Sequence, residues 1–241
     1  MDETRDALTR KLQAFKGLGP EDLIMLRELQ RQRSLIEAGR EVVYEGQYPH
    51  SAYILREGWA CSYKQLRDGS RQIIDIQIAG DFLGLRSLLL RSSDHSFLTI
   101  TDVEVARLDR QRMLDVFRRT PRLAVGLMWA ASRDEAMVVE HLVSIGRRDA
   151  FERTAHFLLE LGERLKLVGI GDGCTYPCPI SQSILADALG MTAIHINRVL
   201  RQLREARIVV FRDGVVEFQD IKRAADITGF EIAYLDQAPV H

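Results

Sequence analysis

Residues 180–203 read ISQSILADALGMTAIHINRVLRQL, and this stretch decides the fold of the C-terminal third of the chain. Ser181 is a favourable N-cap for a first helix, and Gly190 ends that helix because glycine turns such a corner at little cost. Thr192 can cap a second helix. Apolar residues repeat at helical spacing in both segments, namely Leu185, Leu189, Met191, Ile196 and Val199. The stretch therefore predicts two helices joined by a tight turn.

The positions of small residues favour a DNA-reading helix-turn-helix over an ordinary helical hairpin. Two helices that cross steeply need a small residue where their backbones approach, and Ala186 satisfies this need four residues before Gly190. The second helix also has a suitable polar face, because arginine can read guanine, asparagine can read adenine, and either can hold a phosphate. The candidate DNA contacts are Ser181, Gln182, Thr192, Ala193, Ile194, His195, Asn197, Arg198 and Arg201.

Composition predicts a globular protein of about two domains, with 241 residues, 46% of them hydrophobic, 28% charged and a net charge of -1. A DNA-binding protein without net positive charge must concentrate its basic groups, and between Thr192 and Arg212 five arginines accompany one glutamate. No apolar run reaches the roughly 18 residues of a membrane span, and the charged N-terminus is no signal peptide. Three sparse cysteines fit a reducing compartment. We expect a cytoplasmic protein with no membrane partner.

Hydrophobic periodicity divides the chain into three parts of an α+β fold. Residues 1–119 are expected to form two short helices and a small sandwich or jelly-roll barrel of about eight short strands, with the Asp68-Gly69 pair at a hairpin turn. Residues 120–146 are expected to form a long dimerisation helix and hinge. Residues 147–241 are expected to form a winged helix-turn-helix domain, with residues 169–179 as a loop and Asp213-Gly214 at the tip of the wing.

The long helix carries an apolar seam with the 4-3 spacing of a coiled coil. Its members are Ala124, Met128, Ala131, Glu135, Val138, Leu142 and Ile145, of which only Glu135 is polar. A lone amphipathic helix packed on its own domain gives a similar stripe, so the pattern alone leaves both interpretations open. We favour dimerisation, with these contact residues: Met128, Ala131, Val138 and Leu142.

The order of these parts, the GDFLGL segment at 80–85 and the ILADALGMT and INRVLRQL segments resemble the Crp/Fnr family of bacterial transcription regulators over roughly residues 20–230. The resemblance implies a homodimer that inserts one recognition helix per subunit into successive major grooves of a palindromic operator, with RNA polymerase as a further partner. It also implies that residues 1–119 contain a β-roll sensor domain, and that a signal received there reorients the DNA-binding domains through the long helix and hinge.

The effector pocket that the resemblance implies departs from the cyclic-AMP-binding pattern. Its candidate residues are Gly84, Leu85, Arg86, His95 and Ser96. Leu85 stands where those members have a glutamate that holds the ribose, and leucine accepts no hydrogen bond. In those members an arginine and a hydroxyl residue hold the cyclic phosphate, and His95 and Ser96 stand at about the matching positions in this chain. Neutral histidine is a poor anion ligand. The expected effector is therefore not cyclic AMP.

No bound cofactor is expected. The oxygen-sensing branch of the family needs four cysteines for an iron–sulfur cluster, whereas this chain has three, none near its N-terminus. Cys61 and His95 could be offered as haem ligands, but buried structural roles suit them better.

The predicted recognition helix also departs from the best-known members, which read bases with an arginine and a glutamate in its first turn. Ala193 and Ile194 occupy those positions and can make only apolar contacts, for example with a thymine methyl group. The operator half-site is therefore expected to differ from the best-known one.

Two other functions compete with a ligand-controlled regulator. A cupin-like metalloenzyme would need clustered histidines, but the six histidines are scattered, so no metal site and no enzymatic activity are expected. A regulator of the same fold could instead be controlled by its abundance or by cysteine oxidation. Cys174 and Cys178 are the redox candidates, and two loop cysteines without a role are the simpler interpretation.

Overall fold

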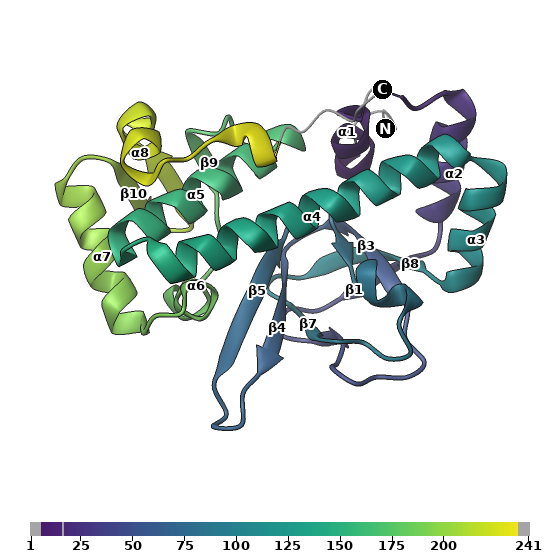
Figure 1. Cartoon of the computed structure of the whole chain (residues 1–241), viewed down its shortest axis with the longest axis horizontal. Helices are drawn as coiled ribbons and strands as arrows, with labels where there is room; N and C mark the ends of the chain where they lie inside the picture. The colour runs from purple at the N-terminus through teal and green to yellow at the C-terminus, as the bar shows by residue number, and fades with distance from the viewer. Residues whose placement is uncertain (1–5, 16, 236–241) are drawn as a thin grey trace.

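The computed structural model describes residues 6–15 and 17–235, which form a β-roll with covering helices and a C-terminal helical unit, both contacted by one long helix (Figure 1). Asp6 caps the first helix and Pro20 begins the second. The helices of this N-terminal part are α1 (Ala7–Gln13), α2 (Pro20–Leu29), the 3-10 turn η2 (Arg86–Leu89) and α3 (Arg110–Arg119). Within the described residues, none of the helices is both long and apolar enough to cross a bilayer.

The β-roll consists of two four-stranded antiparallel sheets, ordered β1-β8-β3-β6 and β2-β7-β4-β5. The predicted hairpin turn at Asp68-Gly69 joins β4 to β5, and Gly69 adopts a φ of 86° there. The strands in the described residues are β1 (Arg33–Ile36), β2 (Glu41–Val43), β3 (Ala52–Glu57), β4 (Ala60–Gln65), β5 (Arg71–Gln77), β6 (Phe82–Leu83), β7 (Ser96–Thr99) and β8 (Val103–Leu108).

The β4–β5 edge of the roll is buried on both faces, so it lacks the simple alternation of a half-exposed sheet. Cys61, Tyr63, Ile73 and Ile76 belong to the same buried cluster as the helices of the C-terminal unit. The two halves of the chain therefore share one hydrophobic core, which is the main apolar attraction between them.

The C-terminal unit contains the predicted helix-turn-helix and wing. Its elements are α5 (Ala150–Leu167), β9 (Thr175–Pro177), α6 (Gln182–Leu189), α7 (Ala193–Glu205), β10 (Val209–Arg212), β11 (Val215–Phe218), α8 (Ile221–Thr228) and the 3-10 turn η3 (Ile232–Tyr234). The prediction of a plain loop over residues 169–179 was wrong, because β9 pairs with β11 and extends the wing to three strands. The pairing partner lies about 40 residues downstream, so no local pattern could indicate it.

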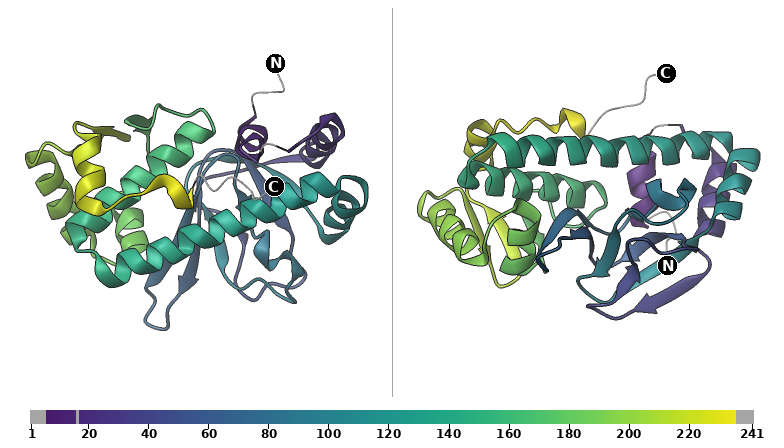
Figure 2. Two further views of the ribbon diagram at one scale, coloured as in Figure 1. Left: turned by 45° about the horizontal axis from the view of Figure 1, so that its top comes forward. Right: turned by 60° about the horizontal axis from the view of Figure 1, so that its bottom comes forward.

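The long helix α4 (Pro121–Arg147) runs past both units, as Figure 2 shows from two further directions. Its inner side is buried against the β-roll, and its outer side carries exposed apolar residues. Ala124 was wrongly assigned to the outer seam, since it is 2% exposed and packs in the core of its own chain with Leu8 and Leu127.

The break between α4 and α5 lies within residues 146–149, the GRRD segment whose sequence predicts a hinge. Gly146 stays within α4, and the helix breaks at Arg148, whose extended backbone leads to Asp149, the N-cap of α5. Arg153 braces this break by donating to the carbonyl groups of Ser144, Arg148 and Leu189. The guanidinium thus links the end of α4 and the end of α6 to the start of α5.

A buried ion pair, His141 of α4 with Glu160 of α5, also joins the two helices that the break at Arg148 separates. Protonated His141 donates from Nε2 to Glu160 Oε1 at 2.8 Å and from Nδ1 to the Ile74 carbonyl at 3.3 Å. Burial alone would lower the pKa of His141, but the Glu160 carboxylate and the more distant Asp75 outweigh it and raise the pKa to about 9. Burial alone would raise the pKa of Glu160, but His141 and the nearby Arg164 lower it to about 2.

We predict that this pair makes stability depend on pH in the alkaline range. Because the folded-state pKa of His141 is raised, its contribution is complete below the unfolded-state pKa of about 6.5 and is lost as pH rises through about 9. The melting temperature should therefore fall between pH 7 and 10, and replacing His141 with Gln should flatten that fall. An equally steep fall in the His141→Gln variant would show that another group titrates.

Candidate DNA-binding surface and effector cavity

The turn between α6 and α7 is built by local hydrogen bonds and one left-handed glycine. Ser181 Oγ accepts from the Ile184 N–H at 3.2 Å, and Thr192 Oγ1 accepts from the His195 N–H at 3.2 Å, so both helices have side-chain caps. Gly190 has a φ of 64°, which favours glycine. The two helices cross over a shared apolar core of Leu185, Ala186, Leu189, Ile196 and Val199.

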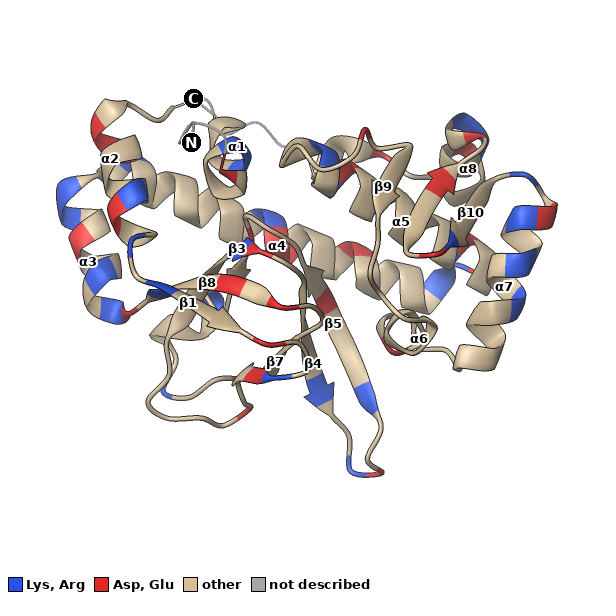
Figure 3. Ribbon diagram, turned by 180° about the vertical axis from the view of Figure 1, so that it is seen from behind, with Lys and Arg blue, Asp and Glu red and all other residues tan. Residues whose placement is uncertain are grey.

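The outer face of α7 is open to solvent and carries basic side chains (Figure 3). Ile194 is 86% exposed in the first turn of α7, beside the exposed Arg198. Asn197 donates from Nδ2 to Gln182 Oε1 at 3.1 Å, which ties the polar faces of the two helices together. Of the candidate DNA contacts, His195 is half-buried and the others are exposed: Ser181, Gln182, Thr192, Ala193, Ile194, Asn197, Arg198 and Arg201.

The outer side of α4 presents apolar side chains that the described part of the chain leaves uncovered. Met128 and Leu142 are exposed, whereas Ala131 and Val138 are half-buried. The exposed apolar residues near them on this helix are Val125, Val139, Val143 and Ile145. The predicted seam is thus accessible at every position except Ala124.

A cavity of about 340 Å³ lies between the β-roll and α4. Its lining includes Gly84, Leu85, Arg86 and His95 from the predicted effector pocket. Ser96 points elsewhere, because its hydroxyl accepts the N–H of Glu45 on the far side of β7. Ser96 is therefore not part of this cavity, whereas the other four candidates line it together.

The cavity is apolar over most of its surface, and its charged lining consists of four carboxylates and the guanidinium of Arg86. Leu85 offers no hydrogen-bond acceptor, and burial lowers the pKa of His95 even though Asp94 lies 2.7 Å from its Nδ1. Arg86 pairs with the same Asp94 at 2.9 Å. The acidic residues in the lining are Asp75, Asp81, Asp134 and Glu135.

Sequence reasoning missed these four acidic residues as parts of the pocket. They come from β5, the turn before β6 and α4, which are distant in sequence. Asp81 stands beside the glycines of the GDFLGL segment, and that position was the one available signal.

The two redox candidates lie on opposite ends of β9 and cannot join each other. An extended strand places residues four apart at a separation of about 13 Å, whereas a disulfide needs Cα atoms within about 7 Å. Cys178 is fully buried, and burial raises the pKa of its thiol to about 12. These features oppose a thiol switch at this pair. Among the described residues, no group of His, Cys, Asp and Glu is arranged to hold a metal ion.

Comparison with known proteins identifies both units. Residues 33–120 match the cyclic nucleotide-binding domain, and residues 152–224 match the Crp-like helix-turn-helix domain. The nitrogen fixation regulation protein FixK of Rhizobium meliloti is 32% identical over 73% of this chain and 77% of its own length. The transcriptional activatory protein AadR of Rhodopseudomonas palustris is 33% identical over 82% of each chain.

A solved structure shows the same architecture. FixK2 from Bradyrhizobium japonicum superposes with a TM-score of 0.74 at 25% sequence identity, covering 83% of this chain and 98% of that chain. The order of β-roll, long helix and winged helix-turn-helix, the two domain matches and these relatives agree, and the chain belongs to the Crp/Fnr family of DNA-binding transcription regulators.

Proposed function

We propose that this regulator binds a palindromic operator as a homodimer, with one α7 helix from each subunit in successive major grooves. The observation that carries the proposal is the outer face of α7, where Ile194, Asn197 and Arg198 are all exposed on one helix that Thr192 caps at its N-terminus. Arginine and asparagine can read base edges, and isoleucine can contact thymine methyl groups. Thr192 at the N-terminus of α7 is placed to contact a phosphate. RNA polymerase is the proposed further partner of the DNA-bound dimer.

The dimer is proposed to form along the outer side of α4. The seam keeps heptad spacing from Met128 through Leu142, with Met128 and Leu142 exposed and Ala131 and Val138 half-buried, which suits a parallel pair of helices. A two-fold axis along α4 would carry the two α7 helices to matching positions on the two-fold operator.

The β-roll is proposed to receive a signal other than cyclic AMP. An anionic nucleotide entering the cavity would meet the side chains of Asp75, Asp134 and Glu135, without the ribose acceptor or a free cation in the usual positions. The charge of the cavity favours a neutral or cationic occupant.

The first prediction concerns base reading. Replacing Arg198 with Ala should weaken binding to an operator selected from a random DNA pool by roughly 5- to 150-fold for each half-site, because each subunit loses one bidentate base contact. Replacing the exposed Arg118 on α3 with Ala removes the same charge far from α7 and should leave affinity unchanged. Quantitative gel shifts measure both. An Arg198→Ala protein with unchanged sequence preference would contradict the assignment.

The second prediction concerns the dimer. Leu142 is 71% exposed in one subunit, so replacing it with Glu should not disturb the fold but would bury a charge in the seam. Sedimentation equilibrium should show a monomer that has lost affinity for the palindromic site. The matched control is Leu35→Glu, which places the same charge on an exposed leucine of β1. If the Leu142→Glu variant remains dimeric, the seam lies elsewhere.

The third prediction concerns the effector. Cyclic AMP at 1 mM should not raise the melting temperature, because each missing contact costs roughly 1–3 kcal/mol and two such losses weaken a ligand by about two to four decades. A ligand that binds only the folded state would raise the melting temperature. Leu85→Glu is the informative variant, since it restores an acceptor at the position where the cyclic-AMP-binding members have a glutamate. A clear rise with cyclic AMP but not with 5′-AMP in the unaltered protein would refute the prediction.

A further inference from the structure

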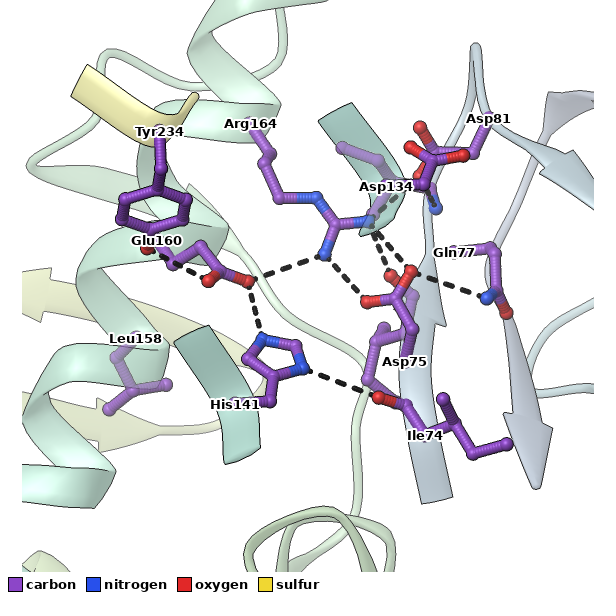
Figure 4. Close-up of polar contacts among 12 residues, drawn as sticks. Ile74, Asp75, Gln77, Asp81, Asp134, His141, Leu158, Glu160, Arg164 and Tyr234 are labelled. Carbon is purple, nitrogen blue, oxygen red and sulfur yellow. Dashed lines mark hydrogen bonds and ion pairs between the residues drawn. The ribbon is translucent and has the colours of Figure 1, made fainter. Parts of the chain in front are cut away.

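The Arg164 guanidinium joins α5 of the DNA-binding unit to the β-roll. Its side chain is 2% exposed, and its contacts cross the boundary between the two units (Figure 4). Nη1 donates to Asp75 Oδ1 at 3.0 Å, and Nη2 donates to Asp81 Oδ2 at 2.9 Å and to the Ile76 carbonyl at 2.7 Å. A planar guanidinium bound by three acceptors has a single orientation, so these contacts fix the position of α5 against β5.

The carboxylates that bind Arg164 also form the polar wall of the cavity. Asp75 and Asp81 both line it, together with Asp134. Lys11 stabilises the same wall, with its Nζ 2.8 Å from Asp81 Oδ1 and 3.4 Å from Asp134 Oδ1. A donor group bound in the cavity would therefore share its acceptors with Arg164.

The cluster is sensitive to the gain or loss of a single charge. Its cations and carboxylates are Lys11, His141, Arg164, Asp75, Asp81, Asp134 and Glu160, and most of them are almost fully buried. Removing one partner from a buried ion pair leaves an uncompensated charge, which is strongly unfavourable. A charge that is added or removed next to the cavity must therefore cause the contacts of Arg164 to rearrange.

We propose that Arg164 is the positioning residue through which the β-roll cavity controls the orientation of the DNA-binding domain. A cationic or hydrogen-bond-donating group in the cavity competes for Asp75 and Asp81 and releases α5 from β5. The proposal rests on the proposed dimeric function, because orientation matters when two α7 helices must match two half-sites.

The first test measures how firmly the domains are held. The double variant Arg164→Met, Asp75→Asn removes one cation and one anion, and it leaves the Lys11–Asp81 and His141–Glu160 pairs in place. Trypsin cleavage at Arg147 and Arg148, followed by mass spectrometry, reports opening of the hinge. We expect cleavage about tenfold faster than in the unaltered protein, within the range of typical coupling between sites. Equal cleavage rates in a folded double variant would overturn the proposal.

The control for this test is Arg56→Met. Arg56 is also largely buried and binds a carboxylate and a carbonyl, Glu104 at 2.8 Å and Gln30 at 3.1 Å, but both lie outside the DNA-binding unit. Cleavage at the hinge should stay unchanged in this variant. If the double variant fails to fold, Arg164→Lys takes its place: it keeps the charge without the planar fork and should be cleaved faster than the unaltered protein. A rate equal to that of the unaltered protein in Arg164→Lys would then overturn the proposal.

The second test measures orientation on DNA. The selected operator is compared with one that carries a half-turn insertion of about 5 base pairs between its half-sites. In the double variant, the ratio of the affinities for the two operators should fall about tenfold, while the affinity for a single half-site stays unchanged. Unchanged discrimination would refute a positioning role. An unaltered protein that ignores spacing would refute the dimeric function instead, and the cleavage test alone would then decide the role of Arg164.

The third test places a cation on the cavity side of the wall. Gln77 lines the cavity and its Nε2 lies 3.3 Å from Asp75 Oδ2. Replacing Gln77 with Lys should speed hinge cleavage by about tenfold over the neutral Gln77→Met control. Equal rates in these two variants would show that the cavity does not act through Arg164.

Discussion

The relative position of the two units depends on a guanidinium that is buried between carboxylates of another domain. Buried ion pairs contribute little net stability compared with apolar residues of the same size. The apolar contacts of β4 and β5 with α5 already supply attraction between the units. Arg164, Asp75 and Asp81 fix the orientation of α5 on the β-roll, because their hydrogen bonds at 2.9 to 3.0 Å allow only one register of α5 against the sheet. The interface is therefore specified by its charges and stabilised by its apolar residues.

Helix α4 meets a second constraint, because it must pack on the β-roll with one side and leave the other side for a second subunit. Heptad spacing cannot separate these two sides, since both interfaces use apolar residues at three and four positions apart. Ala124 and Leu142 fall on the same predicted seam, yet Ala124 is buried in its own chain and Leu142 is exposed. The N-terminal segment decides the difference, because Leu8 of α1 belongs to the buried cluster that contains Ala124, and Leu18, which lies between α1 and α2, packs against it.

The sequence predicted those parts of the fold that local chemistry determines. Ser181, Gly190 and Thr192 act within four residues of their own positions, so the helix-turn-helix could be inferred directly. Strand β9 depends on a distant partner and was missed. Glu160 and Arg164 have the i, i+4 spacing of a solvated helix pair, yet both are buried because β5 covers that face of α5. Burial by remote segments is the information that a single sequence lacks.

The cavity lies between the carboxylates that bind Arg164 and the apolar seam of α4. Met128, Ala131 and Val138 line it from α4 and also belong to the proposed dimer seam. On the opposite wall, Asp75 and Asp81 bind Arg164. An occupant that enlarges the cavity would press on the seam, and one that adds positive charge would weaken the hold on α5, whereas an apolar neutral molecule would act mainly on the seam. The size of the signal can therefore act through the seam, and its charge can act through the contacts of Arg164. Both effects would change the spacing of the two α7 helices.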